Sequence, residues 1–455
     1  MMNCRTKEPE ATLLAQPDSI PGNWEIREGP LLPMAVLKTL LPPEKPLYGL
    51  YTWCGEYRIH RESIKQVGWK SIRIGGPMDD TTFAMIVEDD MEVMMTLGLR
   101  VHGQGKNRSN YTSDKTFIAG FLKGVDAFLT RYGPGGTFFK DNPGLPERPI
   151  KYVEVWNEPN FQYMIPDREP RAEVEAEREA LYSKVLPAAY TYIKSKWPEV
   201  TVVGFGAGGS GSGDVRFIDH VHGNNNKVAA SYDILSTHPY IAPCPPETWW
   251  KKDWPSGGYS TITNLSKIRS IMAEYRNGHK PIWYTEVGWP IAKADGGFFE
   301  EKRPGEQVTP ILQAAYVVRQ YLLSLRQAVE RVHIMFATDT DGFNGGFFLR
   351  DKSWRPSAHA VRNLIRTLPH PRIVQEISDG KEGRYMYRMR PDVGNKEDAY
   401  VLAAWNVAGP DTVEVTMPGN KVRIVDMLGT LINIKCGKRR IQVPIGPCPV
   451  YIMGI

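Results

Sequence analysis

Short apolar runs alternate along most of the chain with longer amphipathic stretches. The runs have the length and composition of buried strands, and the longer stretches repeat their apolar residues at helical spacing. This alternation is typical of repeated βα units around a parallel sheet. The predicted strands are LYGLYTW from Leu47, KSIRIGG from Lys70, LRVHGQG from Leu99, KYVEVWN from Lys151, VTVVGFG from Val200, YDILSTH from Tyr232, PIWYTEV from Pro281 and RVHIMFATD from Arg331. Predicted helices include residues 89–97, 117–131, 172–196, 264–275, 311–329 and 357–368.

These eight strand and helix pairs predict a (β/α)8 TIM barrel over residues 47–369. After that point the pattern changes to short alternating strands separated by Gly, Pro, Asn and Asp, with no helix-length stretch between them. Residues 370–455 are therefore predicted to form a C-terminal antiparallel β-sandwich domain. Residues 1–46 are predicted to form an N-terminal extended arm that packs on this sandwich.

The composition is that of a globular protein with a large core. Hydrophobic residues make up 42% and charged residues 24%, and the 12 Trp, 21 Tyr and 15 Phe leave aromatic rings available for a ligand surface. The net charge of +5 comes from scattered basic residues, which indicates neither a nucleic-acid partner nor a membrane-surface partner. No signal peptide and no apolar run of about 18 residues is found. The chain as written is expected to be cytoplasmic, or secreted if a signal was removed, and its oligomeric state stays open.

The cysteines do not predict a metal site. The five of them are widely spread without CxxC spacing, and the nine histidines show no paired ligand motif. One disulfide, between Cys436 and Cys448, is left open. No metal and no cofactor is expected.

Ionisable and polar residues gather at the predicted carboxyl ends of the strands. In a barrel these ends form the mouth where catalysis takes place, so the residues are expected to converge there. They are Arg73, His102, Asn157, Glu158, His238, Tyr240, Glu286 and Asp339.

Two carboxylates in this group suggest a reaction. Glu158 ends the fourth predicted strand before Pro159, and Glu286 ends the seventh before a Gly-Trp-Pro turn. A pair of carboxylates is what glycoside hydrolysis requires, because one must be protonated while the other is ionised. A separation of about 5 to 5.5 Å would give retention of configuration, and about 6.5 to 9.5 Å would give inversion.

The motifs WNEPN, which contains Glu158, and TEVGWP, which contains Glu286, closely resemble those of the retaining glycoside hydrolases of clan A, the 4/7 superfamily. The resemblance implies that Glu158 is the general acid/base, that Glu286 is the nucleophile, and that Asn157 binds the sugar 2-hydroxyl. It also implies that Arg73 and Tyr240 contact the nucleophile. We expect burial against a tryptophan to raise the pKa of Glu158, and a guanidinium and a phenol to keep Glu286 ionised.

The layout is most similar to family 39 and related polysaccharide hydrolases. It implies a retaining β-glycosidase acting on an oligo- or polysaccharide, with endo action as the first expectation. An exo-acting β-xylosidase-like or β-glucosidase-like enzyme is the alternative. A barrel that binds carbohydrate without catalysis, and a transglycosylase, are further hypotheses.

Further substrate-binding residues are predicted in the mouth loops. His102 and His238 are expected near the sugar, and aromatic rings are expected to line a cleft for several sugars. The aromatic residues are Trp249, Trp250, Trp254 and Tyr259 after the sixth strand and Trp289, Phe298 and Phe299 after the seventh. One departure concerns strand eight, where many clan members place a tryptophan under the reacting sugar and this chain has Phe336 and Asp339.

A competing motif is a GxGxxG pattern in VTVVGFGAGGSGSGD. Gly204, Gly206 and Gly209 follow a strand and precede a helix, as in dinucleotide-binding folds. The segment is the fifth strand of the series rather than the first, and the acidic residue in register, Asp233, opens the next strand instead of closing it. We therefore interpret the glycines as a flexible or close-approach loop beside the sugar site.

Overall fold

The computed structural model describes residues 24–26, 32–40, 47–98, 112–161, 164–209, 213–250, 260–291, 308–340, 343–392, 400–416, 422–434 and 440–454. Among these residues, no helix is both long enough and apolar enough to cross a membrane.

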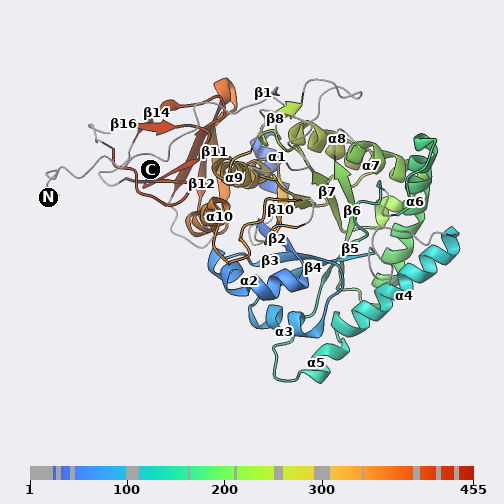
Figure 1. Ribbon diagram of the computed structural model, residues 1–455. Coiled ribbons are helices and arrows are strands. Elements are labelled where there is room, and N and C mark those ends of the chain that lie inside the picture. Colours follow the sequence, from blue (N-terminus) through green and yellow to red (C-terminus); the bar gives the residue numbers. More distant parts are fainter. Residues whose placement is uncertain are drawn as a thin grey trace.

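A closed barrel of parallel strands forms the larger part of the molecule, in the order β10-β2-β3-β4-β5-β6-β7-β9 (Figure 1). Its strands are fully or almost fully buried, which explains their near-continuous apolar sequences. They are β2 (Tyr48–Thr52), β3 (Ser71–Gly75), β4 (Glu92–Leu97), β5 (Tyr152–Val155), β6 (Thr201–Gly209), β7 (Ile234–Pro239), β9 (Ile282–Val287) and β10 (Val329–Met335). The predicted barrel is confirmed.

Helices connect the strands and surround the barrel (Figure 1). Several begin at a polar side chain that accepts a backbone N–H of the first turn, as Asp79, Ser113, Ser260 and Thr309 do. The helices are α2 (Cys54–Val67), α3 (Asp80–Glu88), α4 (Asp114–Tyr132), α5 (Thr137–Asp141), α6 (Arg171–Lys196), α7 (Gly213–Asn224), α8 (Thr261–Glu274), α9 (Pro310–Arg326) and α10 (Pro356–Thr367), with a short 3-10 helix η1 (Val228–Ala230).

The third barrel strand differs from the prediction. It is β4 (Glu92–Leu97), which lies in the segment predicted as the helix 89–97, while the predicted strand 99–105 lies entirely outside the described residues. The preceding helix is α3. The prediction was wrong because three of the apolar residues in β4 (Met94, Met95 and Leu97) are not branched at Cβ, a composition that favours helix. Burial between two neighbouring strands outweighs that preference.

The described part of the N-terminal arm is not simply extended. It contains the helix α1 (Met34–Leu40), whose Leu37 enters the main core. Its strand β1 (Trp24–Ile26) pairs in antiparallel fashion with β8 (Thr248–Trp250), which follows barrel strand β7. The arm therefore contacts a mouth loop of the barrel, and its packing on the sandwich stays a prediction.

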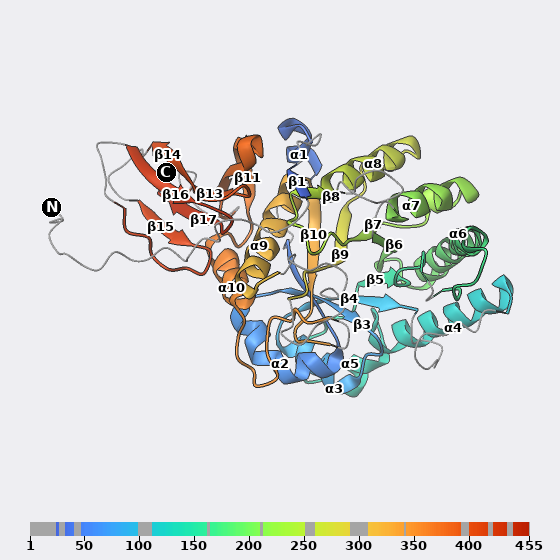
Figure 2. The same ribbon diagram turned by 45° about the horizontal axis from the view of Figure 1, so that its top comes forward.

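The C-terminal residues form the predicted β-sandwich. Its larger sheet has the order β11-β12-β13-β17-β15, and a separate pair, β14-β16, covers one face (Figure 2). The strands are β11 (Arg372–Asp379), β12 (Arg384–Arg390), β13 (Val401–Asn406), β14 (Asp411–Thr416), β15 (Arg423–Asp426), β16 (Arg440–Ile445) and β17 (Val450–Met453), and a 3-10 turn, η2 (Lys381–Gly383), joins the first two. The domain boundaries at 46/47 and 369/370 stay predictions.

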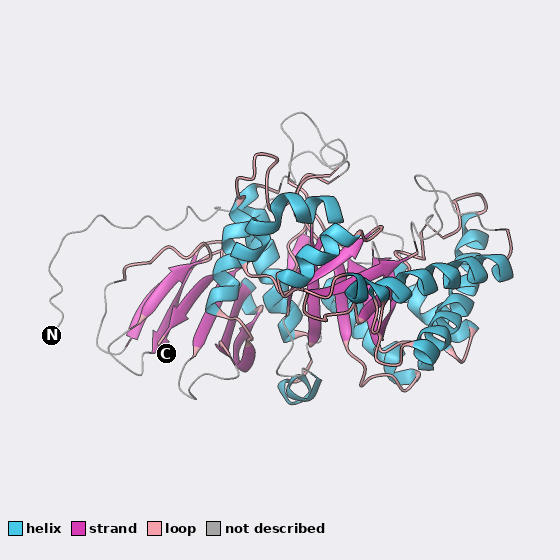
Figure 3. Ribbon diagram, turned by 90° about the horizontal axis from the view of Figure 1, so that it is seen from below, coloured by secondary structure: helices cyan, strands magenta, loops and turns pink. Residues whose placement is uncertain are grey.

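The other face of the larger sheet packs against the barrel through α9 and α10, so the two parts share a core (Figure 3). A buried ion pair lies at this joint, where Arg319 of α9 donates to both carboxylate oxygens of Glu247 at 2.7 and 2.6 Å. Trp405 of the sandwich donates to the same carboxylate at 2.8 Å. The proposed disulfide partner Cys436 lies outside the described residues, whereas Cys448 is buried near this joint.

Candidate active site

The carboxyl ends of β3, β5, β7 and β9 bring most of the predicted site residues together at the barrel mouth. Arg73 comes from within β3, and Asn157 with Glu158 follows β5. His238 is the penultimate residue of β7 and Tyr240 follows that strand, while Glu286 lies in β9. Hydrogen bonds join Arg73 to Asn157 and Glu286, Tyr240 to Glu286, and His238 to Glu158. The two groups approach each other where His238 Nδ1 lies 3.9 Å from Glu286 Oε2.

Arg73 is fully buried and donates hydrogen bonds to three side chains of the site. Its Nη1 donates to Glu286 Oε2 at 2.7 Å, and its Nη2 donates to Asn157 Oδ1 at 2.6 Å. Its Nε and Nη2 also donate to Glu154 Oε2 at 3.0 and 2.7 Å. The guanidinium carbon lies 4.3 Å from the centre of the Tyr51 ring, a cation–π distance. A buried arginine is stable here because carboxylates and an amide take up its donors.

Glu286 accepts a hydrogen bond at each carboxylate oxygen. Arg73 donates to Oε2 and the Tyr240 hydroxyl donates to Oε1. Burial, and after it the charge of Glu286, raises the pKa of Tyr240 well above its usual range, so the phenol keeps its proton and acts as a donor. The two contacts expected from the resemblance are therefore present.

Glu158 is held by its backbone in an uncommon conformation. Its φ is 44°, in the left-handed region that bulky residues rarely adopt, and its N–H donates to the Gly206 carbonyl at 2.9 Å. Trp156, two residues earlier, also has a positive φ, of 73°, and its ring packs on Phe117 and Phe121 of α4. Strained backbone is typical of functional sites, where it aims a particular side chain.

Burial raises the pKa of Glu158 to about 7, with Arg73 opposing the rise and the charge of Glu154 adding to it. The expected direction is present, but the reason differs from the prediction. Desolvation of the carboxyl is the main cause, and the ring of Trp156 packs on α4.

His238 contacts Glu158 and is fully buried. Its Nδ1 lies 3.1 Å from Glu158 Oε1, and its Nε2 lies 3.0 Å from Thr285 Oγ1. Burial lowers the pKa of His238 to about 4, so the ring is neutral at pH 7. A neutral ring with its proton on Nε2 donates to Thr285 and leaves Nδ1 free to accept the proton of a protonated Glu158.

Carboxylate oxygens of Glu158 and Glu286 lie within 4.8 Å of each other, and an imidazole nitrogen of His238 lies within the same distance of both. Two carboxylates and an imidazole are donors that a divalent cation accepts. Here the positive charge of Arg73 already pairs with one oxygen of Glu286, and Tyr240 donates a hydrogen bond to the other. The arrangement therefore fits two carboxylates with separate acid/base roles better than a metal centre.

Glu154 is the site residue that the sequence did not predict. It is completely buried in β5, and besides Arg73 it accepts from Thr96 at 2.9 Å and Ser236 at 2.9 Å. Burial is the largest influence and would raise the pKa of Glu154, but Arg73, His238 and a hydrogen bond from Thr285 together outweigh it, and the pKa falls below its usual value. Alternate barrel strands fill one interior layer, and Arg73, Glu154 and Ser236 come from the second, fourth and sixth strands.

One of the predicted sugar-binding aromatics, Trp289, is buried, and the side chains of the others lie outside the described part of the structure. Trp289 is 1% exposed, donates to the Cys244 carbonyl at 2.8 Å and packs on Tyr316, so its ring has no open face. Trp250 belongs to β8, but its side chain is outside the described part of the structure, as is His102. Their substrate-binding roles stay predictions.

An aromatic cluster at the ends of β2 and β10 was not predicted as a unit. Trp53 is half-buried, and its ring lies 4.4 Å from that of Phe336, the residue at the strand-eight position. Tyr51 contacts both rings. Asp339, also at that strand end, is paired with Arg355 and serves the loop before α10.

The glycine-rich segment does not form a dinucleotide site, since Gly204, Gly206 and Gly209 all belong to the barrel strand β6. A Cβ at Gly206 would lie 3.1 Å from Glu154 Oε1, and one at Gly208 would lie 2.9 Å from Glu158 Oε1. Glycine therefore lets the backbone of β6 approach the acidic residues closely, but these glycines lie in a strand and not in the loop that we expected.

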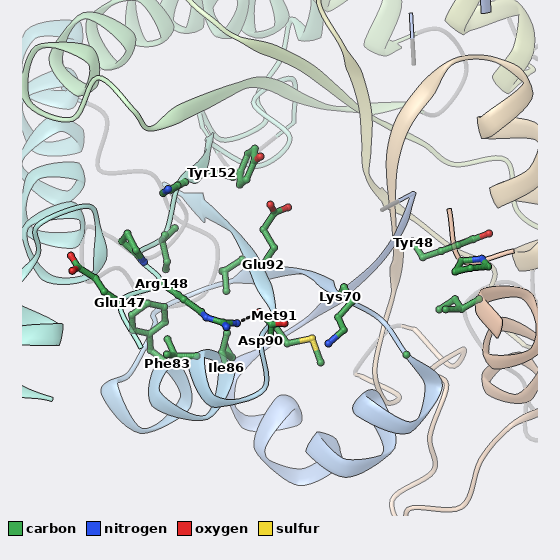
Figure 4. A pocket seen from close by; sticks show the side chains of 18 of the residues that line it. Tyr48, Lys70, Phe83, Ile86, Asp90, Met91, Glu92, Glu147, Arg148 and Tyr152 are labelled. Carbon is green, nitrogen blue, oxygen red and sulfur yellow. Dashed lines mark ion pairs between the residues drawn. The ribbon is translucent and has the colours of Figure 1, made fainter. Parts of the chain in front are cut away.

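A cavity of about 680 Å³ lies at the opposite end of the barrel (Figure 4). Its lining includes Asp90 and Arg148, which form an ion pair, and Glu92, which pairs with Arg331. Barrel enzymes place their chemistry at the carboxyl ends of the strands, whereas this cavity lies at the amino ends. It therefore does not compete with the mouth as a candidate active site.

No protein-family model and no curated protein matches the sequence. Solved structures, however, do match. The chain shares its fold with glycoside hydrolases. A family 39 glycoside hydrolase from Bacteroides cellulosilyticus has a TM-score of 0.62 and 19% identity, over 91% of this chain and 82% of its own.

Two further structures with this fold extend the comparison. A family 51 α-L-arabinofuranosidase from Bifidobacterium longum has a TM-score of 0.60 and 10% identity, over 94% of this chain and 98% of its own. A monomeric β-xylosidase from Caulobacter crescentus has a TM-score of 0.58 and 13% identity, over 90% and 97% of the two chains. The resemblance to clan A inferred from the motifs is confirmed as a shared fold.

Proposed function

We propose that the protein is a retaining glycoside hydrolase that cleaves β-glycosidic bonds by double displacement. The observation that carries this proposal is the pair of carboxylates Glu158 and Glu286, with oxygens within 4.8 Å of each other and in different environments. The short separation supports a covalent mechanism, because inversion needs about 6.5 to 9.5 Å for a water molecule. The fold shared with glycoside hydrolases supports the same reaction class.

In the first step, the Glu286 carboxylate attacks the anomeric carbon while Glu158 donates its proton to the oxygen of the leaving group. A pKa of about 7 keeps Glu158 largely protonated below neutral pH, as a general acid requires. Arg73 and Tyr240 hold Glu286 in place through its two oxygens. In the second step, Glu158 takes a proton from water, which attacks the glycosyl ester and releases Glu286.

Asn157 lies beside Glu158 with its carbonyl oxygen fixed by Arg73. Its amide N–H₂ is therefore oriented as a donor, which supports the proposal that it binds the 2-hydroxyl of the reacting sugar. Such a hydrogen bond can strengthen in the transition state.

The substrate is proposed to be a β-linked oligo- or polysaccharide. The expectation of endo action rests on aromatic loops that are largely outside the described residues, and on Trp289, which is buried. Exo action is the second candidate, supported by the fold shared with the Caulobacter β-xylosidase.

Digestion of a glycan panel with mass analysis of the products tests the sugar, the linkage and the mode together. Internal cleavage gives oligosaccharide ladders, and exo action gives one monosaccharide from the start. Proton NMR of the first product tests retention, since an inverted anomer would contradict the double displacement. Product analysis at high acceptor concentration distinguishes transglycosylation, and the absence of any turnover would favour a binding role.

Substitution of each glutamate tests its role. Glu286→Gln should abolish turnover in a folded protein, so substantial residual activity would overturn the nucleophile assignment. Glu158→Ala should retain part of the first step with activated aryl glycosides, and azide should restore turnover as a β-glycosyl azide. Failure of both effects would contradict the acid/base role.

A further inference from the structure

A second cavity, of about 840 Å³, lies between α10 and the C-terminal sandwich. One wall consists of α10 residues His359, Arg362 and Arg366, which share a helix face through their spacing of three and four positions. Arg423 of β15 and Tyr400 contribute to the opposite side. None of the lining residues belongs to the candidate active site.

The charge of this cavity is uncompensated. Its lining contains three arginines and a histidine but neither aspartate nor glutamate. Within the described part of the chain, Arg362, Arg366 and Arg423 form no ion pair, and Arg362 Nε is buried without a hydrogen-bond partner. Like charges held together in one concave site repel each other, and an anionic ligand would relieve that repulsion.

The walls of the cavity are fixed by the fold. Asn363 of α10 donates to the backbone carbonyls of Asp426 and Met427 at 3.2 and 3.3 Å, which holds the turn after β15 against the helix. The Asp426 carboxylate is buried and accepts the backbone N–H groups of Leu428 and Thr430 at 2.9 Å each. This nearby acid is therefore occupied by the backbone and does not line the cavity.

We propose that this cavity, defined here as the arginine groove, is an accessory binding site for the carboxylate or sulfate groups of an acidic oligosaccharide. Guanidinium groups bind such anions through charge-assisted, often bidentate hydrogen bonds. The volume falls within the range of about 300 to 1,000 Å³ that is typical of ligand pockets. The Arg388 guanidinium lies over the Tyr400 ring at 4.1 Å, and Met453 adds apolar surface on which a sugar ring can pack. A glycan, rather than another polyanion, is favoured by the proposed glycosidase function, on which this choice rests.

Isothermal titration calorimetry on the full chain carrying Glu286→Gln tests the proposal without turnover. The probes are tetragalacturonate, a sulfated tetrasaccharide, neutral cellotetraose and a single-stranded DNA decamer, each at 20 and 200 mM salt. Tetragalacturonate or the sulfated probe should bind, and this binding should be weaker at high salt. Any binding of cellotetraose should not depend on the groove arginines. Adding Arg366→Gln and Arg423→Gln should weaken acidic binding by about tenfold per arginine.

Matched variants make the result decisive. Lys123→Gln removes one exposed positive charge on α4 and should leave binding unchanged, and Arg366→Lys should retain part of it. Arg366 and Arg423 are exposed, so circular dichroism should show that the double variant is folded. When the two substitutions are made in the protein that keeps Glu286, kcat and KM for a neutral aryl glycoside should be unchanged. No binding of either acidic probe, binding insensitive to the arginines, or tighter binding of the DNA would overturn the proposal. Because binding is read without turnover, a failed glycosidase assay would not affect this result.

Discussion

Substitution of Glu158 by glutamine should stabilise the folded protein at neutral and alkaline pH while removing its proposed acid. The pKa of the buried Glu158 is about 7, compared with 4.5 for an ordinary glutamate. The difference of about 2.5 pH units, at 1.36 kcal/mol for each, corresponds to about 3.4 kcal/mol. Glutamine cannot ionise, and its amide can still donate to His238 Nδ1.

The sign follows from where the proton is held. Below pH 4.5 both the folded and the unfolded chain keep Glu158 protonated, so its ionisation has no effect on stability. Between pH 4.5 and about 7 the unfolded chain releases the proton and the folded chain retains it, so stability falls as the pH rises. Above about pH 7 the full cost is present.

Urea unfolding of wild type and Glu158→Gln, followed by tryptophan fluorescence at pH 4.5 and pH 8, measures this cost. The variant should match wild type at pH 4.5 and exceed its free energy of unfolding by about 3 kcal/mol at pH 8. Glu199→Gln, at an exposed glutamate, is the matched control and should shift neither value by more than about 0.5 kcal/mol. If the free energies of unfolding of Glu158→Gln and wild type differ by the same amount at pH 4.5 and at pH 8, the raised pKa of Glu158 is refuted.

Three further predictions concern the site and the domain joint. The kcat/KM of wild type should fall tenfold per pH unit above about pH 7. Glu154→Gln removes a negative charge and should therefore move this fall in kcat/KM to lower pH. Thr96→Val removes a hydrogen bond to Glu154 but keeps its charge, so the fall should stay at the same pH. Trp53→Ala should raise KM about tenfold if its half-exposed ring supports the reacting sugar, and an unchanged KM in steady-state kinetics would exclude that role. Glu247→Gln should lower the free energy of unfolding by about 3 to 5 kcal/mol, because Arg319 keeps its buried charge without a partner, and denaturant titration would show no such loss if the joint is not stabilising.

The sequence alone was sufficient to predict the barrel and the position of the two glutamates at its mouth, while their catalytic roles stay predictions. Strands such as β5 and β9 are rich in β-branched residues, and the turns after Glu158 and Glu286 mark their ends clearly. The third strand could not be recognised, because the methionines of β4 favour helix locally and only burial between two neighbouring strands makes the segment extended.

Residues inside the strands were less accessible to prediction. In a parallel sheet buried on both faces, neighbouring positions are mostly apolar, so the sequence does not tell which side chains face the barrel interior. Glu154 stands between apolar neighbours, and only the closed barrel shows that it faces the interior and meets Arg73 from another strand. Trp289 was predicted to face the sugar, but its ring is buried. The sequence does not tell whether the ring of a tryptophan in a mouth loop faces solvent or the core.

The network also explains why the proton belongs on Glu158 and not on Glu154. Arg73 donates directly to Glu154 and Glu286, but an uncharged amide, Asn157, takes its remaining contact on the side of Glu158. A neutral His238 offers Glu158 no positive charge. Ionising Glu158 would therefore add a second uncompensated negative charge to a buried site. The asymmetry that a two-carboxylate mechanism needs therefore arises from the distribution of one arginine's donors among acceptors at β5 and β9.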